Sequence, residues 1–110
     1  DEETVMKGML KKGYKILITQ VASDGLINWL GKEINAKNFE EFKRDSIKYG
    51  FNILGEGGYY DSLVYDGPIF KKRLKILDSE KIIEGNYNGH IKINKFEVVS
   101  KPSKLVSLSN

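Results

Sequence analysis

The segment Gly55-Glu56-Gly57-Gly58-Tyr59-Tyr60-Asp61-Ser62 separates a chain start that alternates helix and strand patterns from a second half rich in strand patterns. Its glycines leave the backbone free to turn tightly, to take positive φ or to approach a ligand closely. The residues that follow, 59–65, have the composition of a strand. A carboxylate inside the glycine run and another just after it are out of place in a plain turn. Spacing alone therefore leaves two interpretations open, a simple turn and a binding loop.

The residues before this segment are typical of an α/β layer. Residues 1–12 predict a helix with acids in its first turn and lysines in its last, and Gly13 ends it. Residues 14–21 are rich in β-branched side chains and predict a largely buried strand. A loop at 22–25 follows, and ligands often bind at such strand ends. We expect inward-facing side chains at Val5, Met6, Met9 and Leu10.

A second helix is predicted at 39–49, with Asn38 as its N-cap and Gly50 as its end. Trp29, the only tryptophan, is interpreted as a core or domain-contact residue rather than a ligand contact. On the new helix we expect Phe39, Phe42 and Ile47 to face inward.

The second half predicts antiparallel strands joined by turns, and residues 101–110 predict a tail. In the strand at 69–76, we expect Phe70, Leu74 and Ile76 to face the core. The basic residues Lys71, Arg73 and Lys75 would face the solvent. The expected class is α/β (α+β): a helix–strand–helix start followed by a mixed, mainly antiparallel sheet, in one domain over residues 1–100. We expect strands at 51–54, 59–65, 69–76 and 90–99, with turns or loops at 66–68, 78–79 and 85–89.

Composition fits a globular, cytoplasmic protein and argues against disorder or membrane residence. Of the 110 residues, 40% are hydrophobic and 30% are charged, and no apolar run approaches the ~20 residues of a membrane helix. The chain opens with three acidic residues, so no signal-peptide pattern is present. The absence of cysteine excludes disulfides and thiolate metal sites and is compatible with a reducing compartment. The net charge of +3 does not by itself indicate nucleic acid.

Several common ligand-binding and catalytic motifs are not matched by this sequence. The glycines precede a strand rather than a helix and lack the lysine of a phosphate loop and the third glycine of the dinucleotide fingerprint. His90 stands alone, so neither a zinc site nor a histidine-activated nucleophile is expected. Glu56 and Asp61 remain as a general base or Mg²⁺ ligands, or as ordinary surface acids. No metal is expected.

After these exclusions, the segment 55–62 can offer a ligand three kinds of group: carboxylates, aromatic rings and backbone N–H groups. Tyr59 and Tyr60 beside Glu56 and Asp61 supply the aromatic faces and negative charge that hold a quaternary ammonium group. Successive strand residues face opposite sides, so a complete cage needs another aromatic such as Tyr65 or Trp29. The basic run 71–73 is interpreted as the wet face of a strand, with a nucleic-acid groove as the alternative.

The ordered motifs of the chain resemble the C-terminal half of the diphthine–ammonia ligase family of ATP pyrophosphatases. They are Ser-Asp-Gly-Leu with Trp-Leu-Gly at 23–31, Gly-Glu-Gly-Gly at 55–58 and Asp-Gly-Pro-x-Phe-Lys-Lys-Arg at 66–73. The resemblance runs from about residue 2 to residue 98 without obvious gaps. It implies a reaction in which ATP, with Mg²⁺, adenylates the carboxylate of diphthine on a translation elongation factor, and ammonia then displaces AMP to give diphthamide.

The resemblance also implies that two domains share the reaction. In the family an N-terminal domain carries a Ser-Gly-Gly-Lys-Asp-Ser nucleotide loop, which this sequence lacks. We therefore expect no cofactor for this chain alone, an ATP-binding domain acting in cis or in trans, and a diphthine-bearing elongation factor as partner. Membrane and nucleic acid are not expected partners, and no catalytic residue is assigned.

Two departures from the family motif affect the expected site. Tyr59 stands where the family has a second acid, and Asp61-Ser62 replaces Glu-Thr. The alternative is accordingly a diverged, non-catalytic module of the same fold that binds another small molecule or protein. The resemblance implies a substrate site at Gly55, Glu56, Gly57, Gly58, Tyr59, Tyr60, Asp61, Ser62, Lys71, Lys72 and Arg73, with Gly25, Trp29, Gly31, Asp66 and Pro68 as structural motif residues.

Overall fold

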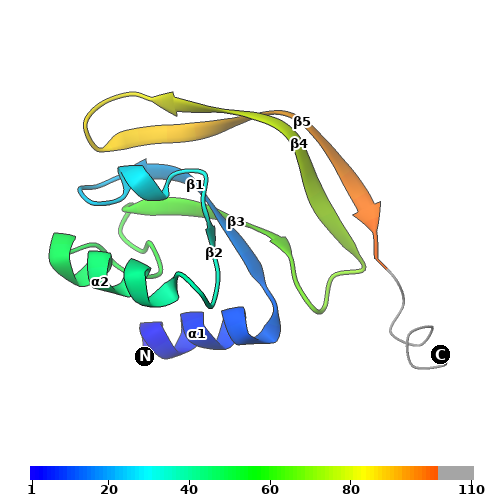
Figure 1. The fold of residues 1–110 in the computed structure, drawn as a ribbon, viewed down its shortest axis with the longest axis horizontal. Helices are drawn as coiled ribbons and strands as arrows, with labels where there is room; N and C mark the ends of the chain where they lie inside the picture. The colour runs from blue at the N-terminus through cyan, green and yellow to red at the C-terminus, as the bar shows by residue number, and fades with distance from the viewer. Residues whose placement is uncertain (102–110) are drawn as a thin grey trace.

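The expected alternation of helix and strand at the chain start is present in the computed structural model, which describes residues 1–101. The elements are helices α1 (Glu2–Lys12) and α2 (Phe39–Tyr49), the 3₁₀ helix η1 (Ile27–Trp29), and strands β1 (Lys15–Ala22), β2 (Glu33–Ile34), β3 (Tyr60–Asp66), β4 (Lys72–Ile83) and β5 (Asn88–Ser100). Both α-helices lie on one side of the sheet, and the β4–β5 hairpin arches away on the other (Figure 1). The expected α/β class is confirmed, and every described strand pairing is antiparallel. The expected tail lies, apart from Lys101, outside the described residues.

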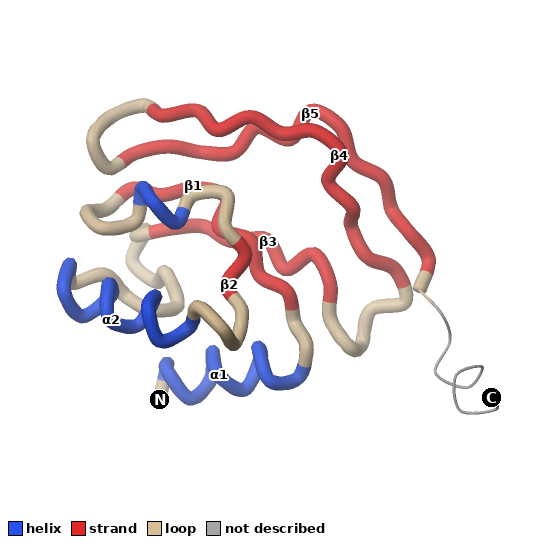
Figure 2. The backbone as a smooth tube through the Cα atoms, viewed as in Figure 1, coloured by secondary structure: helices blue, strands red, loops and turns tan. Residues whose placement is uncertain are grey.

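Strand β1 is the centre of the sheet. β3 pairs along one side of β1. On the other side, β2 pairs with the first half of β1 through Ile16↔Ile34, and β5 pairs with its second half through Gln20↔His90. β4 pairs only with β5. Strands β2, β3 and β4 each pair with a single neighbour within the described chain, so each of the three has a free edge (Figure 2).

The helix boundaries follow from local chemistry. Asp1 is the N-cap of α1 rather than its first residue: its carboxylate accepts a hydrogen bond from the Thr4 amide at 2.8 Å. Gly13 ends α1 with a φ of 97°, as its position predicted. Asn38 precedes α2 as expected, but its side chain braces the preceding turn instead of capping the helix.

The core is built around Phe42 of α2, which is fully buried. Its ring packs against those of Trp29, Phe51 and Tyr60, with centroid separations of 4.9, 5.4 and 5.8 Å. Trp29 is therefore a core residue, as predicted. Its indole N–H donates to the Asp45 carboxylate at 2.8 Å, which satisfies the one polar group of this side chain.

Two predicted strand features are wrong. Residues 51–54 form turns rather than a strand, because the Asn52 side chain accepts a hydrogen bond from the Leu54 amide and closes a tight local turn. Residues 78–79 lie inside β4 and do not turn the chain. The pairing register shifts there, and such bulges bend a strand without ending it.

Five core predictions need correction as well. Leu74 and Ile76 of β4 are only half-buried and lie outside the core cluster. Val5 and Ile47 are 53% and 73% exposed, although both fit the helical spacing of their neighbours. Val5 of α1 and Ile47 of α2 each lie at the margin of the apolar face of their helix, where the helix surface becomes exposed to solvent. Phe70 lies before β4 rather than in it and is only half-buried, where its ring meets Tyr14 edge-on.

Replacing Asp45 with alanine tests the polar support of the core. The substitution leaves the Trp29 indole N–H buried without a partner, so the free energy of unfolding should fall by about 1–3 kcal/mol. Glu41→Ala, at an exposed position of the same helix, should change it by less than about 0.5 kcal/mol. Urea unfolding of both variants measures the difference, and equal stabilities would contradict this role of Asp45.

Candidate functional site

Three loops that are far apart in the sequence meet at one end of the sheet, on the left in Figure 1. They are residues 23–26 after β1, residues 55–59 before β3, and residues 84–87 of the β4–β5 hairpin. Ala22, the last residue of β1, joins them. It pairs with Asn88 on one side, and its amide donates to the Tyr59 carbonyl at 3.0 Å on the other. The topology thus brings two of the sequence motifs, Ser-Asp-Gly-Leu and Gly-Glu-Gly-Gly, to the same end.

The glycine segment is a turn whose backbone requires glycine. Gly55, Gly57 and Gly58 have φ values of 78°, 91° and 85°, which L side chains rarely adopt. At Gly55 a Cβ atom would also approach the Tyr60 carbonyl oxygen to 2.8 Å. The sequence predicted tight turning here, and the structure confirms it.

Side-chain hydrogen bonds hold the loop in place. The Asn52 side-chain oxygen accepts from the Leu54 and Glu56 amides at 2.8 and 3.3 Å, and its amide group donates to Glu2 of α1. At the other end of the loop, the Tyr60 hydroxyl donates to the Ile53 carbonyl at 2.6 Å. The exposed tip is consequently tied to both a helix and the core.

The two tyrosines have different environments. Tyr60 is buried, its ring packs on Phe42, and burial raises the pKa of its hydroxyl above the ordinary value of 10, so it stays a hydrogen-bond donor. Its expected contact with a quaternary ammonium group therefore needs correction, because its ring is enclosed in the core. Tyr59 is half-buried against the core and keeps part of its ring exposed.

The remaining predicted residues of the loop face solvent. Glu56, Gly57, Gly58, Asp61 and Ser62 are exposed, while Gly55 is buried. Asp61 is cross-strand to Gln20, which is itself cross-strand to His90, so these three side chains lie on one face of the sheet.

His90 has a partner that sequence reasoning missed. Its Nδ1 lies 2.6 Å from a carboxylate oxygen of Glu84 in the hairpin turn. The signal was present in the hairpin itself, because a residue before a short turn faces the start of the next strand. Within residues 1–101 no group of three His, Asp or Glu side chains is arranged to hold a metal ion.

The basic residues 71–73 lie far from the end of the sheet where the three loops meet. Lys72 and Arg73 begin β4 and pair with Ser100 and Val99, whereas β4 reaches the loop end only at Ile83. Roughly 35 Å of strand separates the two positions. The expected substrate set therefore divides into a loop group and a distant basic group.

A family model of the diphthamide synthase C-terminal domain matches residues 1–99. The chain belongs to this family. It is also similar to three diphthine–ammonia ligases: 34% identical to that of Schizosaccharomyces pombe over 83 residues, and 33% identical to those of Danio rerio and Homo sapiens over 89 and 86 residues. These matches cover 74%, 78% and 76% of this chain but only 14%, 34% and 31% of the relatives. The expected resemblance is confirmed, and the chain spans about a third or less of these relatives.

Three of the other motif residues have structural roles. Gly25 lies directly beneath the Tyr49 ring, where a Cβ atom would come within 2.1 Å of a ring carbon. Gly31 lies against Ile91 of β5. The Asp66 carboxylate accepts hydrogen bonds from the Lys101 ammonium at 2.6 Å and the Gly67 amide at 2.8 Å; the Lys101 bond lowers its pKa most.

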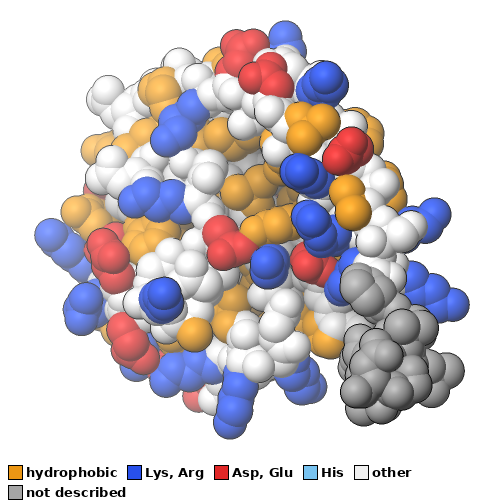
Figure 3. Space-filling model, turned by 45° about the vertical axis from the view of Figure 1, so that its right-hand side comes forward, with side chains coloured by type: hydrophobic (Ala, Val, Ile, Leu, Met, Phe, Trp, Pro, Cys, Tyr) orange, Lys and Arg blue, Asp and Glu red, His pale blue; other side chains and the backbone are white. Residues whose placement is uncertain are grey.

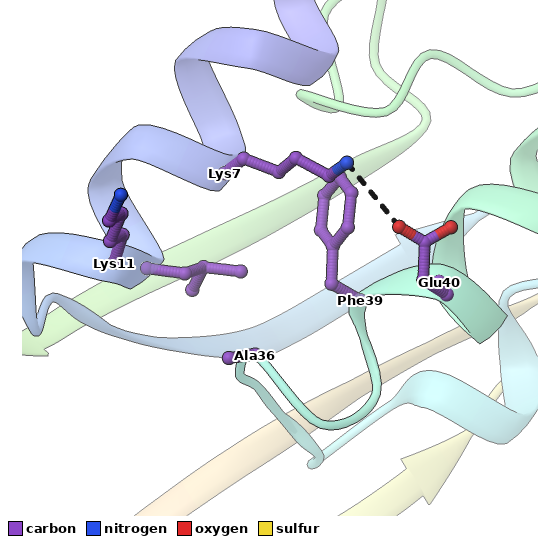
Figure 4. Close-up of a pocket in the computed structure, with 6 residues that line it drawn as sticks. Lys7, Lys11, Ala36, Phe39 and Glu40 are labelled. Carbon is purple, nitrogen blue, oxygen red and sulfur yellow. Dashed lines mark ion pairs between the residues drawn. The ribbon is translucent and has the colours of Figure 1, made fainter.

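A separate hollow of about 300 Å³ lies between the two helices (Figure 4). Lys7 crosses its opening toward Glu40, at 3.4 Å, and its ammonium lies 5.6 Å from the Phe39 ring centre. No residue of the family motifs lines this hollow, and no sequence pattern predicted it beyond the inward spacing of Leu10. Within residues 1–101, no helix is long and apolar enough to cross a membrane.

Matched tyrosine substitutions test how the loop is held. Tyr60→Phe leaves the Ile53 carbonyl without its donor, so we expect a loss of about 1–2 kcal/mol in unfolding free energy and faster amide exchange in the loop. Tyr59→Phe should change stability by less than about 0.5 kcal/mol, since its hydroxyl makes no hydrogen bond to residues 1–101. Urea unfolding and hydrogen exchange measure both effects. Equal behaviour of the two variants would contradict this anchoring.

Proposed function

We propose that this domain recognises the substrate of an ATP-dependent amide ligase resembling diphthine–ammonia ligase. The complete reaction would convert diphthine, ATP and ammonia to diphthamide, AMP and pyrophosphate. The observation that carries the proposal is the glycine loop, anchored by hydrogen bonds at both ends, which places Glu56, Tyr59 and Asp61 at the end of the sheet in a member of this family. The partner would be a diphthine-bearing translation elongation factor in the cytoplasm.

The loop chemistry suits the cationic head of diphthine. A quaternary ammonium has no N–H to donate, so it is held by aromatic faces and by nearby negative charge. Tyr59 supplies a partly exposed ring, and Glu56 and Asp61 supply exposed carboxylates that form no ion pair with described residues. The exposed backbone of Gly57 and Gly58 offers N–H groups to the substrate carboxylate.

The same residues do not suit ATP. Asp24, Glu56, Asp61 and Glu84 place exposed carboxylates on the loops of this end, and these repel phosphate groups. The sequence also lacks a phosphate loop. ATP and its Mg²⁺ would therefore be held by a nucleotide-binding domain, in cis or in trans, and this domain would bind and orient diphthine. We assign it no catalytic residue.

Tyr59 supports a second candidate function. It replaces an acid of the family motif, which exchanges a charge for an aromatic face. A diverged domain that binds a different small molecule or protein at the same loops would also use such a surface. A thermal-shift screen separates the two, because stabilisation only by ligands without a quaternary ammonium would favour the diverged module.

Charge-neutral substitutions in the loop test the proposed site. For Glu56→Gln with Asp61→Asn we expect the KM for diphthine-bearing elongation factor to rise about tenfold, because two carboxylates no longer face the ammonium. The assay measures AMP release with the nucleotide-binding domain present. Glu41→Gln, which removes an exposed carboxylate from α2, should leave KM unchanged.

Two results would contradict the proposal. One is unchanged kinetics in the double variant, which would place the site elsewhere. The other is no AMP release from a correctly folded domain supplied with its nucleotide-binding partner and substrate, which would exclude the ligase function.

A further inference from the structure

A hollow runs beside β4 on the face of the sheet opposite the helices. It consists of two adjoining pockets of about 270 and 400 Å³, which share Leu17 and Ile76. We call it the edge groove. Its lining includes Leu17, Tyr65, Arg73, Lys75, Ile76 and Lys81.

The lining shows that the groove follows the free edge of β4. Four consecutive residues, 73–76, reach the same pocket. Successive side chains of a strand point to opposite faces, so all four can line one hollow only if it lies along the strand edge. Tyr65 of β3 contributes from the other side, and β3 has a free edge as well. The groove thus lies between two strands that each have one unpaired edge.

The floor of the groove is aliphatic and continues onto exposed surface. Ile76 is cross-strand to Phe96, and Leu74 is cross-strand to Val98, so each pair shares one face of the hairpin. Phe96 and Val98 are 57% and 59% exposed. Figure 3 shows hydrophobic side chains gathered in the hollow of this side of the molecule. Contiguous apolar surface of this kind usually marks a contact site.

The charged residues that line the groove are all basic, although two acids lie close by: Glu97 is cross-strand to Lys75, and Glu33 accepts a hydrogen bond from the Tyr65 hydroxyl. Arg73, Lys75 and Lys81 line the groove, no lining residue is acidic, and none of the three forms an ion pair with residues 1–101. Figure 3 shows basic side chains, with some acidic ones among them, around the apolar hollow. A second copy docked edge to edge would bring like charges together, which opposes self-association. Complementarity therefore favours an acidic partner.

We propose that the edge groove binds an extended acidic segment of another protein, in which acidic and aliphatic residues alternate. The segment would add a strand to β4, with its aliphatic side chains on the groove floor and its carboxylates near Arg73, Lys75 and Lys81. A nucleic acid fits less well, because Tyr65 is the only aromatic lining residue and its hydroxyl is bonded to Glu33. This interaction does not depend on diphthine recognition at the loop end.

The test uses a fluorescein-labelled peptide of eight residues that alternates glutamate and valine, titrated with the 110-residue chain. Fluorescence anisotropy should report binding that weakens at least about tenfold in Arg73→Glu/Lys75→Glu, since charge reversal places like charges together. Lys37→Glu/Arg44→Glu carries the same change in net charge on exposed positions outside the groove and should bind as the unmodified chain does. Circular dichroism checks that both variants are folded.

A backbone-modified peptide separates strand addition from simple charge attraction. Methylating all its amide nitrogens removes the donors that a new strand needs, so binding should be lost. Equal binding of the methylated peptide would overturn the proposal. So would tighter binding of a twelve-nucleotide single strand, or a dimer in sedimentation experiments that Arg73→Glu/Lys75→Glu abolishes.

Discussion

The hydrogen bond from the Tyr60 hydroxyl to the Ile53 carbonyl connects the core of this domain to its candidate site. Because the Tyr60 ring also packs on Phe42, the first residue of β3 is fixed in the core while the glycine loop before it remains at the surface. The loop needs this anchor, since three residues with positive φ would otherwise leave it free to move. The position of Glu56, Tyr59 and Asp61 follows from the anchor.

The domain has two candidate binding surfaces that differ in their charged residues. The loop end carries carboxylates and a partly exposed tyrosine, whereas the edge groove is bordered by arginine and lysines. The long β4–β5 hairpin connects them: its turn belongs to the loop end, and its open end borders the groove. This arrangement gives a physical reason for a hairpin much longer than its pairing with β1 requires.

Local chemistry made much of the fold predictable from the sequence. Gly13, Gly50 and the β-branched run in β1 fixed element ends and types, and Trp29 was correctly assigned to the core. The errors arose where a long-range contact competes with local preference. Asp78-Ser79 has turn chemistry, but pairing with β5 carries the strand through it as a bulge. Tyr60 looked like a site residue because no sequence pattern reveals which of two adjacent tyrosines faces the core.

We propose that the loop end binds the quaternary ammonium of diphthine. Titrating the ¹⁵N-labelled domain with a diphthine-containing peptide, and following backbone amide signals by NMR, is the decisive measurement. We expect saturable shifts at Gly57, Gly58, Tyr59 and Asp61 that are weaker with the unmodified histidine peptide. Shifts confined to the hollow between α1 and α2, or no difference between the two peptides, would contradict it.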